Sequence, residues 1–127
     1  MNYAIYVAPL RLQEGKKLYT LNYNRIQSAH FIVKGKLKET YEALIRRQCL
    51  PSQRFKQVNL TLVLYPKDKR RRDRANVLCL HEKFCCDALV KAGVLADDSD
   101  DYVLSTTYFT GSIDKNDPRV EIHVTEA

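Results

Sequence analysis

The segment Lys56–Tyr65 constrains the fold more than any other, because its apolar side chains recur at every second position. That spacing is the pattern of a β-strand with one apolar face. The residues on this face are Val58, Leu60, Leu62 and Leu64. Pro66 ends the strand, since proline has no amide hydrogen to donate to a sheet. The chain therefore contains a sheet whose apolar face other elements must cover.

A long helix is predicted after the basic loop that follows this strand. Asp73 has the residue type of an N-cap. The helix is expected to run to Ala92, where Gly93 is a typical residue for ending a helix. Its apolar face is predicted to hold Val77, His81, Phe84, Cys85, Ala88 and Ala92.

The remaining elements complete an α+β chain. A second helix is predicted over 36–48 and is expected to end before Pro51. A polar loop containing Gly15 and residues 21–25 is expected before it. Three further strands are predicted over 2–7, 102–110 and 119–125. The order βαβαββ predicts an α/β sandwich of the α+β type, with two helices packed on one mixed β-sheet. The 127 residues are expected to form one domain.

Charge is distributed unevenly along the chain. Residues 1–60 hold eleven Lys or Arg and three acidic residues, residues 61–96 hold eight and four, and residues 97–127 hold two and eight. The net charge of +6 therefore combines a strongly basic first part with an acidic tail. Such a basic field favours a nucleic acid or an anionic surface as partner. A membrane surface is disfavoured, because the helix at 36–48 has few large apolar side chains.

The sequence shows no sign of secretion or membrane insertion. No apolar run approaches the roughly 20 residues that span a bilayer, and Met1–Leu10 lacks the features of a signal peptide. A cytoplasmic location is expected, with Cys49, Cys79, Cys85 and Cys86 as reduced, mostly buried thiols. A zinc site built from His81 and the last three cysteines is disfavoured. On a helix these side chains point about 100° to 160° apart, so they cannot converge on one ion.

The segment Arg70–Asp98 joins a basic run, a helix and acidic residues at both helix ends. Arginines hold phosphates as forked donors, and carboxylates hold Mg²⁺ together with substrate oxygens. This combination suits metal-dependent cleavage of a phosphate backbone. Each feature alone has an ordinary alternative, namely a solvated basic patch or an acidic turn, so the inference depends on their order.

A helical wheel places four residues of this segment on one edge of the helix. At 100° per residue, Asn76, Leu80, Lys83 and Asp87 fall within about 40° of one another. Asp73 lies next to them at the amino-terminal end. One interpretation is a surface ion pair between Lys83 and Asp87, and the other is an edge that bears catalytic groups.

The same residues form a recognisable order: RRD-x-x-N, a helical lysine, DAL-x-K-A-G and a terminal DD. This order resembles the RusA family of Holliday junction resolvases, which are small phage and prophage endonucleases. The matching residues are Arg71–Asp73, Asn76, Lys83, Asp87–Gly93 and Asp97–Asp98. More weakly, Asn22–Arg25 resembles the family's asparagine-rich basic segment, and Pro118–Thr125 resembles its last strand.

The resemblance implies a homodimer that binds four-way DNA junctions by shape and cuts opposing strands with Mg²⁺ or Mn²⁺. Asp73 and Asp98 match family aspartates that hold the metal, and Lys83 matches an essential lysine. The residues expected to bind DNA are Lys69, Arg70, Arg71, Arg72, Arg74, Asn76, Asn24 and Arg25. No small-molecule cofactor is expected, and the resemblance implies the cytoplasm of a bacterial host cell.

Two departures from the family pattern affect the metal site. The family motif is D-x-D-N, whereas this chain has Ala75 at the second aspartate. The segment Asn76–Lys83 is also four residues longer than in common members of the family. Asp87, Glu82 or Asp97 could supply the missing ligand, and Asp87 is preferred because it shares an edge with the lysine. The alternative function is binding of junctions or branched DNA with weak or no cutting. An RNA-binding module is disfavoured, because the aromatic residues do not gather on one strand.

Overall fold

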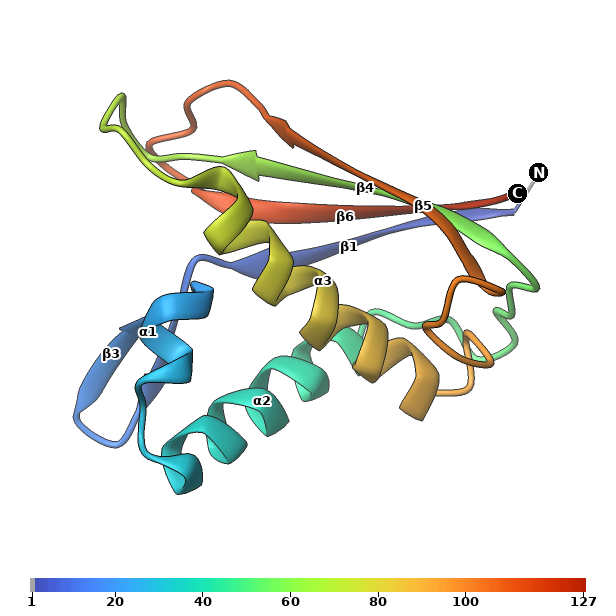
Figure 1. The fold of residues 1–127 in the computed structure, drawn as a ribbon, viewed down its shortest axis with the longest axis horizontal. Helices are drawn as coiled ribbons and strands as arrows, with labels where there is room; N and C mark the ends of the chain where they lie inside the picture. The colour runs from blue at the N-terminus through green and yellow to red at the C-terminus, as the bar shows by residue number, and fades with distance from the viewer. Residues whose placement is uncertain (1) are drawn as a thin grey trace.

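The computed structural model describes residues 2–127, which form a four-stranded mixed sheet with its helices on one face (Figure 1). In chain order the elements are β1 (Tyr3–Pro9), β2 (Arg11–Glu14), β3 (Lys17–Thr20), α1 (Tyr23–Gln27), α2 (Phe31–Arg46), β4 (Val58–Tyr65), α3 (Arg74–Lys91), β5 (Val103–Thr110) and β6 (Arg119–Glu126). The strand order is β1-β6-β4-β5. Only β4 and β5 are parallel neighbours, while β2 and β3 form a separate hairpin. The predicted α+β class with a mixed sheet is confirmed.

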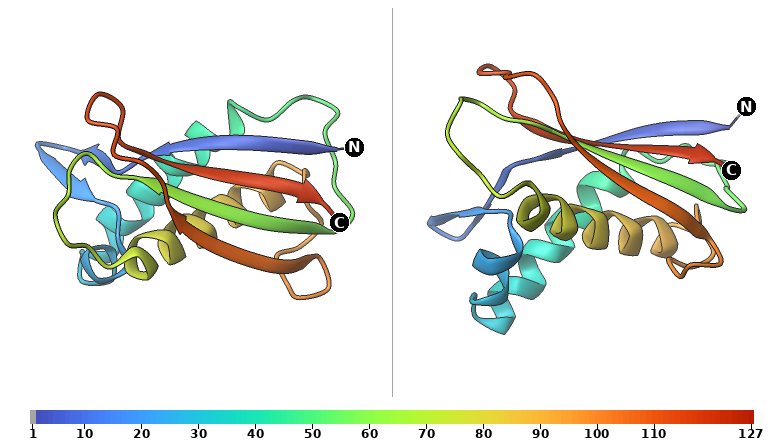
Figure 2. Two further views of the ribbon diagram at one scale, coloured as in Figure 1. Left: turned by 90° about the horizontal axis from the view of Figure 1, so that it is seen from above. Right: turned by 45° about the horizontal axis from the view of Figure 1, so that its top comes forward.

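The alternating segment forms β4, which lies inside the sheet between β6 and β5. Its apolar residues Val58, Leu60, Leu62 and Leu64 are almost completely buried. They face α2 and α3, which both lie on the same side of the sheet (Figure 2). The opposite face of the sheet carries no helix in any of the views. The core therefore sits between one sheet face and the helices.

The caps predicted for α3 are confirmed. Asp73 is extended and its side chain accepts a hydrogen bond from the amide of Asn76 at 3.3 Å. Gly93 follows the helix with φ +76°, a conformation that favours glycine. The buried face is wider than predicted, because α3 packs against the sheet and α2 and also contacts α1. The buried residues that the prediction omitted are Leu78, Leu80, Cys86 and Leu89.

The amino-terminal third differs from the prediction. The expected polar loop contains the hairpin β2–β3 and the short helix α1. These elements were missed because each has only four or five residues and most of their side chains are exposed. Helix α2 begins at Phe31, before the predicted start, because the Nδ1 atom of His30 caps it by accepting from the amide of Ile32 at 3.2 Å. Histidine is not among the preferred capping residues.

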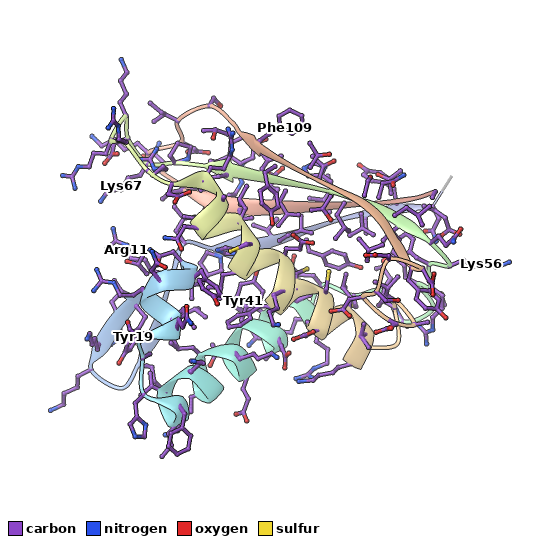
Figure 3. All side chains as sticks on the ribbon, in the orientation of Figure 1. Arg11, Tyr19, Tyr41, Lys56, Lys67 and Phe109 are labelled. Carbon is purple, nitrogen blue, oxygen red and sulfur yellow. The ribbon has the colours of Figure 1, made fainter. Side chains whose placement is uncertain are left out.

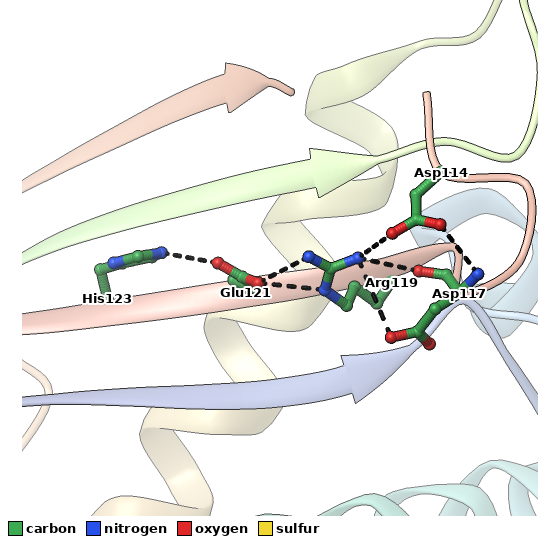
Figure 4. A network of polar contacts seen from close by, with 5 residues as sticks. All are labelled: Asp114, Asp117, Arg119, Glu121 and His123. Atoms are coloured by element: carbon green, nitrogen blue, oxygen red, sulfur yellow. Dashed lines mark hydrogen bonds and ion pairs between the residues drawn. The ribbon is translucent and has the colours of Figure 1, made fainter. Parts of the chain in front are cut away.

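The connection between β5 and β6 is held by Arg119 on the open face of the sheet (Figure 4). Its guanidinium contacts Asp114 at 2.8 Å and Glu121 at 3.0 Å. The guanidinium also lies 4.2 Å from the ring centre of Tyr65 in β4. Among the helices described, none is long and apolar enough to cross a membrane.

Candidate nucleic-acid interface

The loop from Pro66 to Asp73 joins β4 to α3 and lines a cavity of about 370 Å³ at the amino-terminal end of α3. The hairpin β2–β3 and the start of α1 supply the opposite wall. The charged residues of the lining are Arg11, Lys67, Asp68, Arg70, Arg71, Arg72 and Asp73. Figure 3 shows Arg11 and Lys67 at the same end of the molecule. Five cations against two carboxylates make this cavity an electropositive site.

The conformation of the basic loop depends on Asp68. Its carboxylate accepts from the amide of Arg70 at 3.0 Å and from the guanidinium of Arg72 at 2.8 Å. The hydrogen bond from the Arg70 amide lowers the pKa of the Asp68 carboxyl, and the charges of Arg70 and Arg72 lower it further. Arg72 also donates to the backbone oxygen of Asp68, so this side chain braces the loop. Lys69, Arg70 and Arg71 are exposed instead. The predicted DNA-binding run therefore divides into one bracing arginine and three exposed cations.

The amino-terminal end of α3 adds to the positive field of the cavity. The first turn of the helix contains no acidic residue. Backbone amides at a helix amino terminus favour an anion, and the helix dipole reinforces this preference. The exposed cations and the helix end together suit a phosphate group. Arg74, the first residue of the helix, turns toward β5 and donates to the hydroxyl of Thr110 at 3.2 Å.

Asn76, Asn24 and Arg25 were predicted to bind DNA, and the structure places all three near the contact of α1 with α3. The side-chain oxygen of Asn76 accepts from the amide of Asn24 at 3.1 Å. Asn22 caps α1 by accepting from the amide of Arg25 at 2.8 Å. Asn76 thus holds α1 against α3, whereas the side chain of Arg25 is exposed. The asparagine-rich segment has a structural task that the sequence did not indicate.

Asp73 and Asp98 lie at opposite ends of α3. The helix has 18 residues, which corresponds to about 27 Å. Mg²⁺ binds its ligands at about 2.0 to 2.1 Å, so one ion is shared only by carboxylates whose oxygens lie close together. Across residues 2–127, no group of three or more His, Cys, Asp or Glu is placed to hold a metal ion.

Asp87, the preferred substitute ligand, faces α2. Its carboxylate is 2.6 Å from the Nζ atom of Lys38. Asp87 therefore pairs with a residue of another helix. The surface ion pair between Lys83 and Asp87 that one interpretation predicted is not formed. Lys83 is exposed and lines a second cavity of about 440 Å³ together with Lys34 and residues of α1. Lys83 also lies ten residues from Asp73, about 15 Å along the helix.

Glu82 lies on the other edge of α3 and faces β5. Its carboxylate accepts from the hydroxyls of Tyr108 at 2.5 Å and Thr106 at 3.1 Å. Burial and then this carboxylate raise the pKa of the Tyr108 hydroxyl. Glu82 is seven residues after Ala75, so the two positions share a helix edge. The seven-residue spacing from Ala75, and not the spacing from Lys83, is the sequence signal that places Glu82 on this edge.

Cys79 and Cys86 lie on this same edge, and burial together with nearby acidic charges raises the pKa values of their thiols. Burial first, and then the charges of Glu82 and Asp98, raise the pKa of Cys86 to about 12. Burial and, more weakly, the charges of Glu82 and Asp73 raise the pKa of Cys79. The contacts of Glu82 with Tyr108 and Thr106 place this acid on the β5 side of α3. Asp97, the third candidate ligand, is exposed beside Asp98 and accepts from its amide at 2.9 Å.

The residues considered for zinc, Cys79, His81, Cys85 and Cys86, all belong to α3. All four cysteines are free thiols, and Cys85 and Cys86 are buried. His81 is completely buried, and its Nδ1 atom is 2.7 Å from the hydroxyl oxygen of Tyr41. Burial lowers the pKa of His81 to about 3. His81 is thus a neutral core residue that joins α3 to α2.

A comparison of the sequence with protein-family models and with curated proteins found no match.

Proposed function

We propose that this protein is a metal-dependent endonuclease that resolves four-way DNA junctions as a homodimer. The observation that carries the proposal is the cavity at the amino-terminal end of α3, where five cations surround the helix end and Asp73 is part of the lining. Forked guanidinium donors and helix amides both suit phosphate oxygens. A carboxylate beside a bound phosphate suits a metal ion that assists hydrolysis.

The arginines divide the work of holding DNA. Lys69, Arg70 and Arg71 are exposed and would contact phosphates directly. Arg72 holds Asp68 and so keeps the loop in its conformation. Because phosphate contacts carry no sequence information, this surface supports recognition of DNA by shape.

The carboxylates along α3 fit Mg²⁺ or Mn²⁺ in chemistry, because these ions prefer oxygen ligands. Asp73 follows Arg72 directly in the chain and lines the cavity of the arginines. Asp98 follows the far end of α3 in the chain, and in the proposal the second copy of the homodimer supplies it. When bound, the ion would activate water and stabilise charge on the phosphate. The homodimer is therefore part of the proposal.

The proposal places the protein with the DNA that it cuts, in the cytoplasm of a bacterial host cell. It includes no small-molecule cofactor and no membrane partner.

A second candidate function is binding of branched DNA without efficient cutting. Ala75 offers no ligand where an acid is expected. Asp87 is already engaged by Lys38, and Glu82 by two hydroxyls. These contacts favour a weak metal site beside an intact phosphate-binding surface.

Cleavage of a synthetic junction separates the two functions. The purified protein is incubated with an end-labelled four-way junction in Mg²⁺, in Mn²⁺ and in EDTA, with a linear duplex of one arm as control. Paired symmetrical nicks that need the metal support the endonuclease. Equal binding in all three conditions with no nicks would replace it by the binding function, and no preference for the junction over the duplex would reject both.

A further inference from the structure

The two edge strands of the sheet, β1 and β5, differ in whether side chains bond their outward backbone groups. At β1, the side-chain amide of Gln48 bonds both groups of Val7: its Oε1 accepts from the Val7 amide at 2.8 Å and its Nε2 donates to the Val7 carbonyl at 2.9 Å. Gln53 donates to the carbonyl of Tyr3 at 3.4 Å. Side chains of the same molecule thereby bond three backbone groups on the outer edge of β1, at Val7 and Tyr3.

The outer edge of β5 has no such cover. The amide of Gly111 donates to Leu64 of β4 at 2.8 Å, so residues at alternate positions before it also direct their backbone groups toward β4. Thr106, Tyr108 and Thr110 therefore direct theirs away from the sheet. In the part of the chain that the structure describes, the backbone amides and carbonyls of these three residues bond no other group.

The sequence of β5 also lacks the usual protection of an edge strand. Native edges are blocked by charged residues, proline or bulges, whereas Val103–Thr110 contains no charged residue and no proline. A register shift occurs only at the start of the strand, opposite Val58 and Asn59. Phe109 is 54% exposed beside this edge (Figure 3). An edge of this kind is suited to pairing with another strand.

We infer that β5 pairs in antiparallel orientation with β5 of a second copy, which joins two four-stranded sheets into one of eight strands. Charge selects a second copy over an unrelated strand. Four aspartates, at 97, 98, 100 and 101, precede β5. The opposite end of β5 lies at the basic end of α3, where Arg74 bonds Thr110. Antiparallel pairing of two copies places the acidic start of each strand beside the basic end of the other.

The pairing also has a consequence for the helices. A two-fold axis between antiparallel strands runs through the sheet, so both copies carry their helices on the same face. β5 spans about 26 Å and α3 about 27 Å, so each pair of strand ends lies near a pair of helix ends. Asp98 of one copy then lies on the same side as Asp73 of the other. The inference rests on the edge of β5 and not on the proposed nuclease activity.

Hydrogen exchange of individual amides tests the pairing directly. The full chain is first confirmed as a dimer by sedimentation equilibrium, and exchange is then followed by NMR. The amides of Thr106, Tyr108 and Thr110 are expected to be protected, although no group of their own chain bonds them. Rapid exchange of all three in a dimeric sample, or a monomeric protein throughout the concentration range, would overturn the inference.

A pair of variants at Thr106 gives the second test. Thr106→Pro removes the outward amide hydrogen and leaves the bonds to β4, whereas the control Thr106→Val removes only the hydroxyl that bonds Glu82. By symmetry the proline deletes two hydrogen bonds, so the dimer dissociation constant is expected to rise roughly ten- to a hundredfold relative to the valine variant. Equal constants contradict the pairing. If the proline variant does not fold, the exchange experiment still decides.

Cutting of a junction by the same wild-type sample keeps this inference apart from the proposed function. A dimer that cuts while its β5 amides exchange rapidly would reject the β5 interface and leave the nuclease. A dimer with protected β5 amides that never cuts would do the reverse.

Discussion

The two long edges of α3 carry polar groups that do different things. On the edge toward α1 and α2, Asn76 bonds the backbone of α1 and Asp87 pairs with Lys38. On the edge toward β5, Glu82 accepts from the hydroxyls of Tyr108 and Thr106 and shares a helix edge with Ala75. The first edge joins helices, whereas the second lies beside an open strand. A helical wheel therefore identifies which residues share an edge but not which edge faces a functional surface.

The largest expected effect separates Asp73 from Asp87. Asp73→Asn should reduce junction cutting by roughly a hundredfold or more, because it removes the negative charge of the carboxylate that would hold the metal ion beside the phosphate. Junction binding should be unchanged or tighter. Asp87→Asn should keep cutting near the wild-type rate, because Asp87 faces α2. Initial cleavage rates with saturating protein measure both, and loss of cutting in Asp87→Asn alone would return the site to the α2 edge.

The next prediction concerns the acids on the β5 edge. Ala75→Asp should lower the Mg²⁺ concentration for half-maximal cutting by about tenfold, because it adds a second carboxylate two positions after Asp73. Glu82→Gln should raise that concentration if Glu82 supplies the substitute ligand. Mg²⁺ titrations of the two variants and the parent compare these effects. Unchanged midpoints in both variants would show that the β5 edge holds no metal.

The arginines of the loop offer a comparison of the same kind. Replacing Arg70 and Arg71 by alanine should reduce the slope of log affinity against log salt by roughly two, because two phosphate contacts are lost. Arg72→Ala should change the slope less but loosen the loop, because Arg72 bonds Asp68. Binding measured across a salt series gives both slopes. Equal slopes for the parent and the double variant would assign those arginines to solubility alone.

The smallest expected effect is on stability. The Lys38–Asp87 pair is partly exposed, so Lys38→Met should cost about 0.5 to 1 kcal/mol in the free energy of unfolding. Lys34→Met is the matched control, because Lys34 is on the same helix and shows no ion pair within residues 2–127. Urea denaturation compares the two. A larger loss for Lys34→Met would contradict the role given to the pair.

Local sequence signals predicted the parts of the fold that depend on short-range physics. The alternation around Leu62 identified β4, and Asp73 and Gly93 marked the ends of α3. In each case one residue type or one period acts on its own neighbourhood. The predicted packing of helices on a mixed sheet followed from these elements.

The candidate site depended on contacts between distant segments, which no local pattern contains. Asp87 and Lys38 are 49 positions apart, and Asn24 and Asn76 are 52 apart. His30 and the short strands of the hairpin gave signals too weak to extend α2 or to predict β2 and β3. The wheel placed Lys83 and Asp87 correctly on one edge, but only the packing of α2 showed what that edge faces.

Gln48 has a consequence for how many copies can assemble. A sheet with two receptive edges would accept a strand at each side, and growth could then continue without limit toward a fibre. Because Gln48 already bonds both backbone groups of Val7, a copy added at β5 presents outward a β1 edge that is blocked at that residue. One glutamine side chain thus opposes the addition of a further strand at β1 and favours an assembly that stops at the inferred pair.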